Sequence, residues 1–142
     1  MSLKDFTEDQ LIEQIKSSVK PGPNTIIGIG DDCAVLHTDN PEIVELFKTD
    51  SVVENVHFTR DMGAKRIGYK AAARVFSDMA AMAGAPTELL VTLILPSSVA
   101  PEWILELYSG INSICDPYGV GVVGGETTQS PCLLYTSDAA DD

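Results

Sequence analysis

The sequence predicts an α+β domain in which helices cover one face of a mixed β-sheet. Three observations lead to this class. A chain of 142 residues is about one domain long, and its 44% apolar composition is enough to bury a core. A long alanine-rich segment separates several short β-rich segments from a strand–helix–strand pattern. The predicted order is therefore a leading helix followed by β-β-β-α-β-α-β, without an internal repeat or linker.

The first elements follow from capping and turn residues. Thr7 and Gln10 have the spacing of a capping box, and apolar residues follow at helical spacing, so we predict a helix over 7–18 that ends before Pro21. Four β-rich segments separated by turn residues then predict paired strands. These segments are residues 25–29, 33–36, 42–49 and 52–58.

The second half contains the longest predicted helix, over residues 64–83, closed by Gly84 and Pro86. Three more elements follow: a strand over 88–95 that ends at Pro96, an amphipathic helix from Pro101 to about Cys115, and a strand over 119–125. From residue 130 the sequence "SPCLLYTSDAADD" begins like a strand and ends in small and acidic residues without periodicity. We therefore expect a domain over 1–130 and a disordered or non-native tail over 131–142.

Bulk properties exclude several classes of partner. The formal net charge of −12 argues against nucleic acid, which needs clustered basic residues. No apolar run approaches the roughly 18 residues of a membrane span, and the polar start "MSLKDFTEDQ" is unlike a signal peptide. Three cysteines without a CxxC pair argue against a disulfide scaffold. We expect a soluble cytoplasmic protein without a membrane or nucleic-acid partner.

Acidic residues recur where elements begin or end. Asp31 and Asp32 follow glycines at 28 and 30, either in a solvated turn or beside a bound cation. Asp78 lies within the apolar stripe of the helix over 64–83, where a carboxylate needs a metal or a partner such as Arg74. Asp50 interrupts a strand-like run.

Glu126 repeats the pattern of the first loop, because it follows an apolar strand and two glycines in "VVGGETT". Carboxylates from several elements, beside glycines that expose backbone N–H groups, suit Mg²⁺ and nucleotide phosphates. The patterns GxGxxG, GxxxxGK[ST], HExxH and GxSxG are absent. Their absence argues against a Rossmann dinucleotide loop, a Walker-type phosphate loop, a zinc protease and a serine hydrolase, respectively. His57 fits either a structural histidine or a phosphate contact.

Four segments in this order and spacing resemble the N-terminal half of the thiamine-monophosphate kinase family: "GIGDDCAVL", "KTDSVVENVHF", "YKAAARVFSDMAAMAGAP" and "YGVGVVGGETT". The resemblance runs from about residue 5 to about residue 130. It implies the N-terminal domain of the aminoimidazole ribonucleotide synthetase-like fold, which forms homodimers. It also implies transfer of the γ-phosphoryl group of ATP to thiamine monophosphate, assisted by Mg²⁺ and without a protein nucleophile.

The resemblance also implies roles for individual residues. Asp31 would support the first loop, and His57 would contact the thiamine phosphate. The implied ATP-binding residues are Asp32, Thr49, Gly125 and Glu126. The implied Mg²⁺ ligands are Asp32, Thr49, Asp50, Asp78 and Glu126.

Three residues depart from the family pattern. Glu126 stands where the family usually has Asp, Lys48 where a small hydroxyl residue is common, and Arg74 where Asn is frequent.

The sequence does not include the second domain of the family, so we expect a fragment with little turnover. Two alternatives stay open: another ATP-dependent synthetase of the superfamily, or a non-catalytic dimerisation or metal-binding module.

Overall fold

The computed structural model describes residues 4, 6–130 and 134–141. Its element order is α1 (Glu8–Ser18), β1 (Thr25–Ile27), β2 (Ala34–His37), β3 (Val44–Val53), η2 (Arg60–Met62), α2 (Ala64–Ala81), β4 (Glu88–Leu95), α3 (Pro101–Cys115), η3 (Asp116–Tyr118), β5 (Gly121–Gln129) and β6 (Leu134–Asp141). None of the helices in the described part of the chain combines the length and apolarity needed to cross a membrane.

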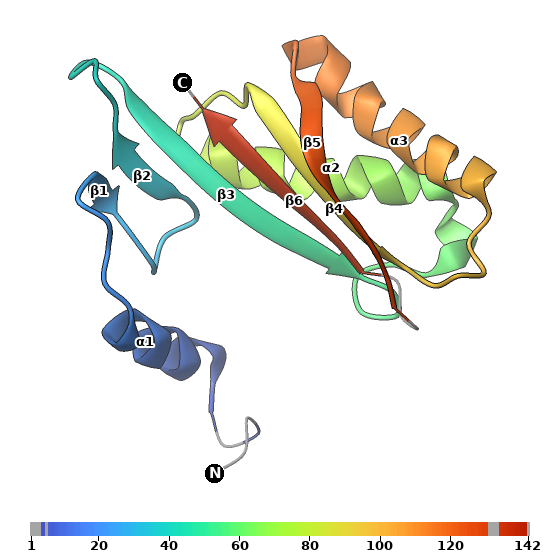
Figure 1. The fold of residues 1–142 in the computed structure, drawn as a ribbon, viewed down its shortest axis with the longest axis horizontal. Coiled ribbons are helices and arrows are strands. Elements are labelled where there is room, and N and C mark those ends of the chain that lie inside the picture. Colours follow the sequence, from blue (N-terminus) through green and yellow to red (C-terminus); the bar gives the residue numbers. More distant parts are fainter. Residues whose placement is uncertain (1–3, 5, 131–133, 142) are drawn as a thin grey trace.

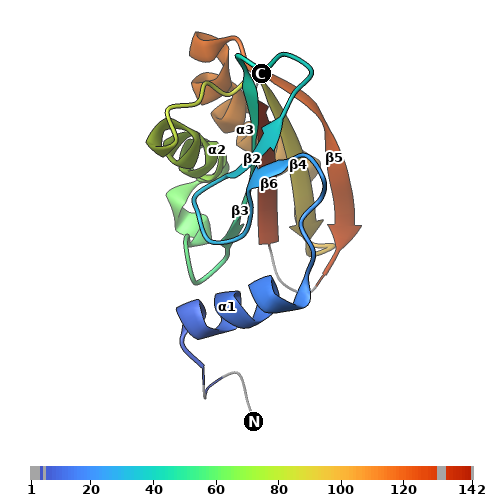
Figure 2. The same cartoon turned by 90° about the vertical axis from the view of Figure 1, so that its left-hand side faces the viewer.

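Six strands form one mixed sheet in the order β1-β2-β3-β6-β4-β5. The pair β4–β5 is parallel, and the other pairs are antiparallel. Helices α2 and α3 cover one face of this sheet, whereas α1 lies apart, beyond β1 and β2 (Figures 1 and 2). The predicted α+β class, with helices on one face of a mixed sheet, is confirmed.

The core lies between the sheet and the two covering helices. Every second residue of β4 is buried, from Leu89 to Leu95, because alternate side chains of a strand point to the same face. These residues pack with Ile67 and Met79 of α2 and Ile111 of α3, all of which are fully buried. The opposite face of the sheet is uncovered and exposes apolar side chains such as Phe47 and Leu90.

Helix α1 has the predicted capping box. The Thr7 hydroxyl accepts a hydrogen bond from the backbone N–H of Gln10, and the Gln10 side chain accepts one from the N–H of Thr7. No residue of α1 is buried. The capping box therefore begins the helix where the sequence predicts it, although the helix contributes nothing to the buried core.

Two predictions about strands are wrong. The segments predicted as separate strands over 42–49 and 52–58 are largely one strand, β3, which runs through Asp50 and ends at Val53. The tail over 131–142, predicted to be disordered or non-native, contains the ordered strand β6, which pairs with β3 on one side and with β4 on the other. Two neighbouring strands supply backbone partners there, so β6 needs no hydrophobic alternation of its own. Residues 131–133 and 142 lie outside the described residues.

Candidate functional site

A groove of about 910 Å³ lies between the end of α1 and strands β1, β2 and β3. The loop from Gly28 to Asp32 forms one wall, and Lys48 and Thr49 of β3 also line it. Lys16 and Lys20 lie at its α1 side. The groove therefore combines glycine backbone, two carboxylates and the two lysines Lys16 and Lys20, a mixture suited to a phosphorylated ligand with a metal ion.

The conformation of the Gly28–Asp32 loop depends on Gly30, whose φ of 121° disfavours side-chain-bearing residues. A Cβ at Gly30 would lie 3.4 Å from the Lys16 ammonium nitrogen, so α1 approaches this loop closely. The Asp31 carboxylate accepts a hydrogen bond of 2.8 Å from the backbone N–H of Asp32. Asp31 thus holds the loop, while the exposed Asp32 side chain lies at the groove.

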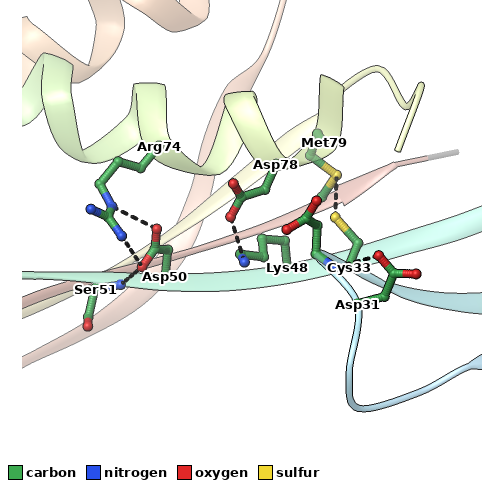
Figure 3. Close-up of polar contacts among 9 residues, drawn as sticks. Asp31, Cys33, Lys48, Asp50, Ser51, Arg74, Asp78 and Met79 are labelled. Carbon is green, nitrogen blue, oxygen red and sulfur yellow. Dashed lines mark hydrogen bonds and ion pairs between the residues drawn. The ribbon is translucent and has the colours of Figure 1, made fainter. Parts of the chain in front are cut away.

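Four charged residues lie between β3 and α2, and Figure 3 shows them as two facing pairs. The Lys48 ammonium nitrogen is 2.5 Å from an Asp78 carboxylate oxygen. The Arg74 guanidinium donates to both oxygens of Asp50, at 2.8 and 3.3 Å. We call Lys48, Asp50, Arg74 and Asp78 the charge quartet. Asp78 therefore has a partner on the sheet, and the Arg74 partner suggested by sequence spacing instead binds Asp50.

The pKa of Asp50 reflects this pairing. Burial alone would raise it, but hydrogen bonds from Arg74 and from the backbone N–H of Ser51, with the nearby Lys48 charge, hold it below its ordinary value of 3.8. Asp50 therefore stays a carboxylate at neutral pH.

The buried Cys33 thiol lies near Lys48 and Asp78. Burial raises the pKa of this thiol, the Lys48 charge opposes the shift, and the Asp78 charge adds to it. Cys33 stays a protonated thiol, which is unsuited to bind metal.

Thr49 points to the other face of the sheet from Asp50. Leu46, Lys48, Asp50 and Val52 alternate with Phe47 and Thr49 along β3, and Leu46 and Val52 are buried towards the helices. Asp50 and Asp78 thus lie on the helix side, whereas Thr49 lines the groove on the uncovered side. The structure does not bring these three predicted metal ligands together.

Gly125 and Glu126 lie on β5, at the far edge of the sheet. Glu126 is level with Ser51 across β4 and β6, so three strand spacings, or roughly 14 Å, separate it from β3. Both residues line a second hollow of about 460 Å³ together with Tyr108 of α3. Gly125 has a φ of 141°, and a Cβ there would lie 1.8 Å from the Val91 carbonyl oxygen. Only glycine fits at this position.

His57 lies in the turn after β3. Its Nδ1 accepts a hydrogen bond of 3.0 Å from the backbone N–H of Val53, and its carbonyl accepts one from the Lys70 ammonium. The hydrogen bond at Nδ1 fixes the ring in its turn, which agrees with the interpretation of His57 as a structural histidine. Because Nδ1 is an acceptor, the neutral ring has its proton on Nε2, which leaves that nitrogen able to donate to a phosphate.

Mg²⁺ prefers oxygen ligands in octahedral geometry. Carboxylates of the predicted set supply the right kind of atom. Within residues 4, 6–130 and 134–141, however, no three acidic, histidine or cysteine side chains form a group able to hold a metal ion. As they lie, Asp50 and Asp78 are each paired with a basic side chain. These two carboxylates therefore do not form an open Mg²⁺ site, and Asp32 at the groove suits the ion better.

Sequence reasoning missed two features of the site. It named Arg74 as a possible partner of Asp78 and noted Lys48 and Arg74 as departures from a family pattern, but it did not predict that Lys48 pairs with Asp78 and Arg74 with Asp50. It also assigned no role to Lys16, although α1 brings that residue to the glycine loop. A signal for Lys48 was present: residues two apart on a strand point to the same face, so Lys48 and Asp50 share a face. That face meets α2, which carries Asp78.

Comparisons with known proteins agree with this architecture. The thiamine-monophosphate kinase of Bacillus subtilis (strain 168) is 36% identical over 131 residues, which are 92% of this chain and 40% of that protein. The enzyme of the same name from Rhodopirellula baltica is 33% identical over 126 residues, covering 84% of this chain and 40% of that protein. The chain thus spans about 40% of the length of these curated relatives.

Solved structures show the same relationship. AaThiL complexed with AMPPCP and TMP superposes with a TM-score of 0.89 at 30% identity, covering 99% of this chain and 43% of that chain. The thiamine monophosphate kinase from Aquifex aeolicus superposes with a TM-score of 0.83 at 26% identity, with the same coverage. The family model described as AIR synthase related protein, N-terminal domain, matches residues 30–139, which is more than half of the sequence. This chain therefore belongs to the family of AIR synthase related proteins, as an N-terminal domain.

Proposed function

We propose that this chain forms the ATP-binding and thiamine-monophosphate-binding domain of a thiamine-phosphate kinase. The reaction transfers the γ-phosphoryl group of ATP to the phosphate of thiamine monophosphate and gives thiamine diphosphate. The observation that best supports this proposal is the superposition, over 99% of the chain, on AaThiL complexed with AMPPCP and TMP. The 910 Å³ groove beside a glycine loop and two aspartates supports it independently.

The residues of the groove would act by binding and orienting two phosphorylated ligands. The exposed backbone of Gly28–Asp32 and the Lys16 ammonium would meet phosphate oxygens, and Asp32 and Thr49 would meet the metal ion that accompanies ATP. His57, through its Nε2 proton, would donate to the thiamine phosphate. Gly125 and Glu126 would contact a more distant part of the nucleotide. Mg²⁺, when bound with ATP, neutralises the negative charge of the phosphates as one attacks another.

The proposal includes a homodimer in the cytoplasm, where ATP is available and buried thiols such as Cys33 stay reduced. The uncovered sheet face exposes Phe47 and Leu90, which a second copy could cover. Light scattering of the purified chain tests this part: a mass near 30 kDa, twice the 15.2 kDa of one chain, is expected. A monomer at all concentrations would contradict it.

The central test is calorimetric titration with AMPPCP in the presence and absence of Mg²⁺. We expect binding that requires Mg²⁺ and that weakens by about tenfold in Asp32→Asn, because the substitution removes a carboxylate from the groove. The matched control is Asp39→Asn, which removes the same charge from an exposed turn after β2 and should leave affinity unchanged. Absence of AMPPCP binding, or an equal loss in both variants, would contradict the proposal.

A further inference from the structure

We propose that the Lys48 ammonium group takes the place of a divalent metal ion at Asp78, so that this carboxylate binds no free Mg²⁺ or Mn²⁺. The inference deepens the proposed function, because Asp78 is one of the metal ligands that the family resemblance implies. It concerns metal binding in the absence of nucleotide. It can therefore fail or succeed independently of the kinase proposal.

The first support is the geometry of the Lys48–Asp78 pair. The two side chains come from β3 and α2 and point toward each other across the space between sheet and helix (Figure 3). The ammonium nitrogen lies 2.5 Å from the Asp78 carboxylate oxygen, and the side chains are only 19% and 27% exposed. At this degree of burial the pair is screened much less by water than a surface pair, so Lys48 competes strongly with any other cation.

The second support is the arrangement of the whole charge quartet. Lys48 and Asp50 are two residues apart on β3, and Arg74 and Asp78 are one helical turn apart on α2. Each strand residue faces a helix residue of opposite charge, which gives two parallel ion pairs. The quartet has two positive and two negative charges and is neutral. A divalent ion added here would meet a carboxylate whose charge Lys48 already balances, and it would come close to the Lys48 ammonium group, which is unfavourable.

The third support is the position of the remaining carboxylates. In the described ranges of the chain, no three candidate ligands come close enough to hold a metal ion. Glu126 is three strand spacings from β3, and Asp32 lies at the groove. Asp78 thus has no acidic side chain in a suitable group with which to outcompete Lys48. The ammonium group is the cation that neutralises it.

The experiment is a titration with Mn²⁺ alone, in which electron paramagnetic resonance measures the free ion. We compare the wild-type chain with Lys48→Ser, and with Lys65→Ser as matched control. Lys65 is an exposed lysine near the start of α2, 13 residues or about 20 Å along the helix from Asp78. Both variants lower the net charge equally, but only Lys48→Ser removes the ammonium group from Asp78.

We expect Lys48→Ser to gain a Mn²⁺ site at least about tenfold tighter than any site in the wild type or in Lys65→Ser. The gain should disappear in Lys48→Ser combined with Asp78→Asn. If Lys48→Ser does not fold, Lys48→Gln, which is one atom shorter than lysine but keeps an uncharged hydrogen-bond donor at the end of the side chain, should show the same gain. Tight Mn²⁺ binding by the wild type that Asp78→Asn abolishes, an equal gain in Lys65→Ser, or a gain that survives Asp78→Asn would overturn the inference.

Discussion

Helix α2 contacts its two main neighbours in chemically different ways. Its contact with α3 is made by glycines: a Cβ at Gly68 would lie 2.0 Å from the Leu107 carbonyl oxygen, and one at Gly110 would lie 1.9 Å from the Lys65 carbonyl oxygen. Its polar contact with β3 is made by the charge quartet. The α2–α3 contact requires glycine, which has no side chain, and the α2–β3 contact requires side chains of opposite charge. Substitutions at the two contacts should therefore alter different properties.

The largest expected effect comes from filling the glycine contact. Gly110→Ala should destabilise the fold by about 3 kcal/mol, because its new methyl group would overlap a backbone carbonyl that cannot move without separating the helices. Helix propensity alone predicts the opposite sign, a gain of roughly 0.5–1 kcal/mol. Urea denaturation measures the difference.

Gly121→Ala is the control for that measurement. A Cβ at Gly121 meets no atom closer than 3.9 Å, so we expect a change within about 0.5 kcal/mol. A stable Gly110→Ala variant would mean that α2 and α3 can move apart. The α2–α3 contact would then not depend on glycine, and it would no longer differ in this respect from the α2–β3 contact.

A smaller, pH-dependent effect is expected in the charge quartet. The pKa of Asp50 in the folded state lies below its ordinary value of 3.8, so its stabilising contribution is complete above that value and is lost as the pH falls through the folded pKa. Asp50→Asn should reduce the free energy of unfolding by about 1–2 kcal/mol at neutral pH. The difference from the wild type should shrink as the pH falls below 3.8.

Urea denaturation at a series of pH values measures this difference. Asp39→Asn, in an exposed turn, serves as the control and should change stability by less than about 0.5 kcal/mol. A loss in Asp50→Asn that persists unchanged to low pH would show that packing, rather than charge, holds β3 against α2 at this point.

The smallest effect is expected at the end of α2, outside both contacts. Ala83 has a φ of 60°, in the left-handed region that glycine adopts at less cost. Ala83→Gly should therefore stabilise the chain by about 0.5–1 kcal/mol. Ala80→Gly, at an exposed helical position three residues earlier, should instead destabilise it by about 1 kcal/mol. Equal signs for the two variants would contradict the structural explanation.

Local features of the fold could be predicted from the sequence. The capping box at Thr7, the strand over 88–95 and the helix from Pro101 to Cys115 all have short-range causes, and the structure confirms them. Strand β6 could not be predicted, because its backbone partners lie on β3 and β4, more than 30 residues earlier in the chain. The end of α2 was predicted near Gly84, but the left-handed residue that follows the helix is Ala83.

The candidate site shows the same limit. The periodicity of α2 correctly places Asp78 beside the buried Ile67 and Val75, where a carboxylate needs a partner. Spacing along the helix suggests Arg74 as that partner, since an i, i+4 neighbour is the one that a single sequence reveals. The real partner, Lys48, is 30 positions earlier and reaches Asp78 only because β3 packs against α2. Pairings of this kind depend on tertiary structure.

The position of β6 has a consequence for how the domain folds. Among the described residues, β6 alone joins strands β1–β3 and β4–β5 into one sheet, and it follows all five of them along the chain. During synthesis, the edges of β3 and β4 that pair with β6 stay unpaired until residues 134–141 leave the ribosome. Sheets closed by such long-range pairing form slowly, and their open edges favour association with other chains. The slow step of folding should accordingly be the insertion of β6, and chaperone binding should matter most before it.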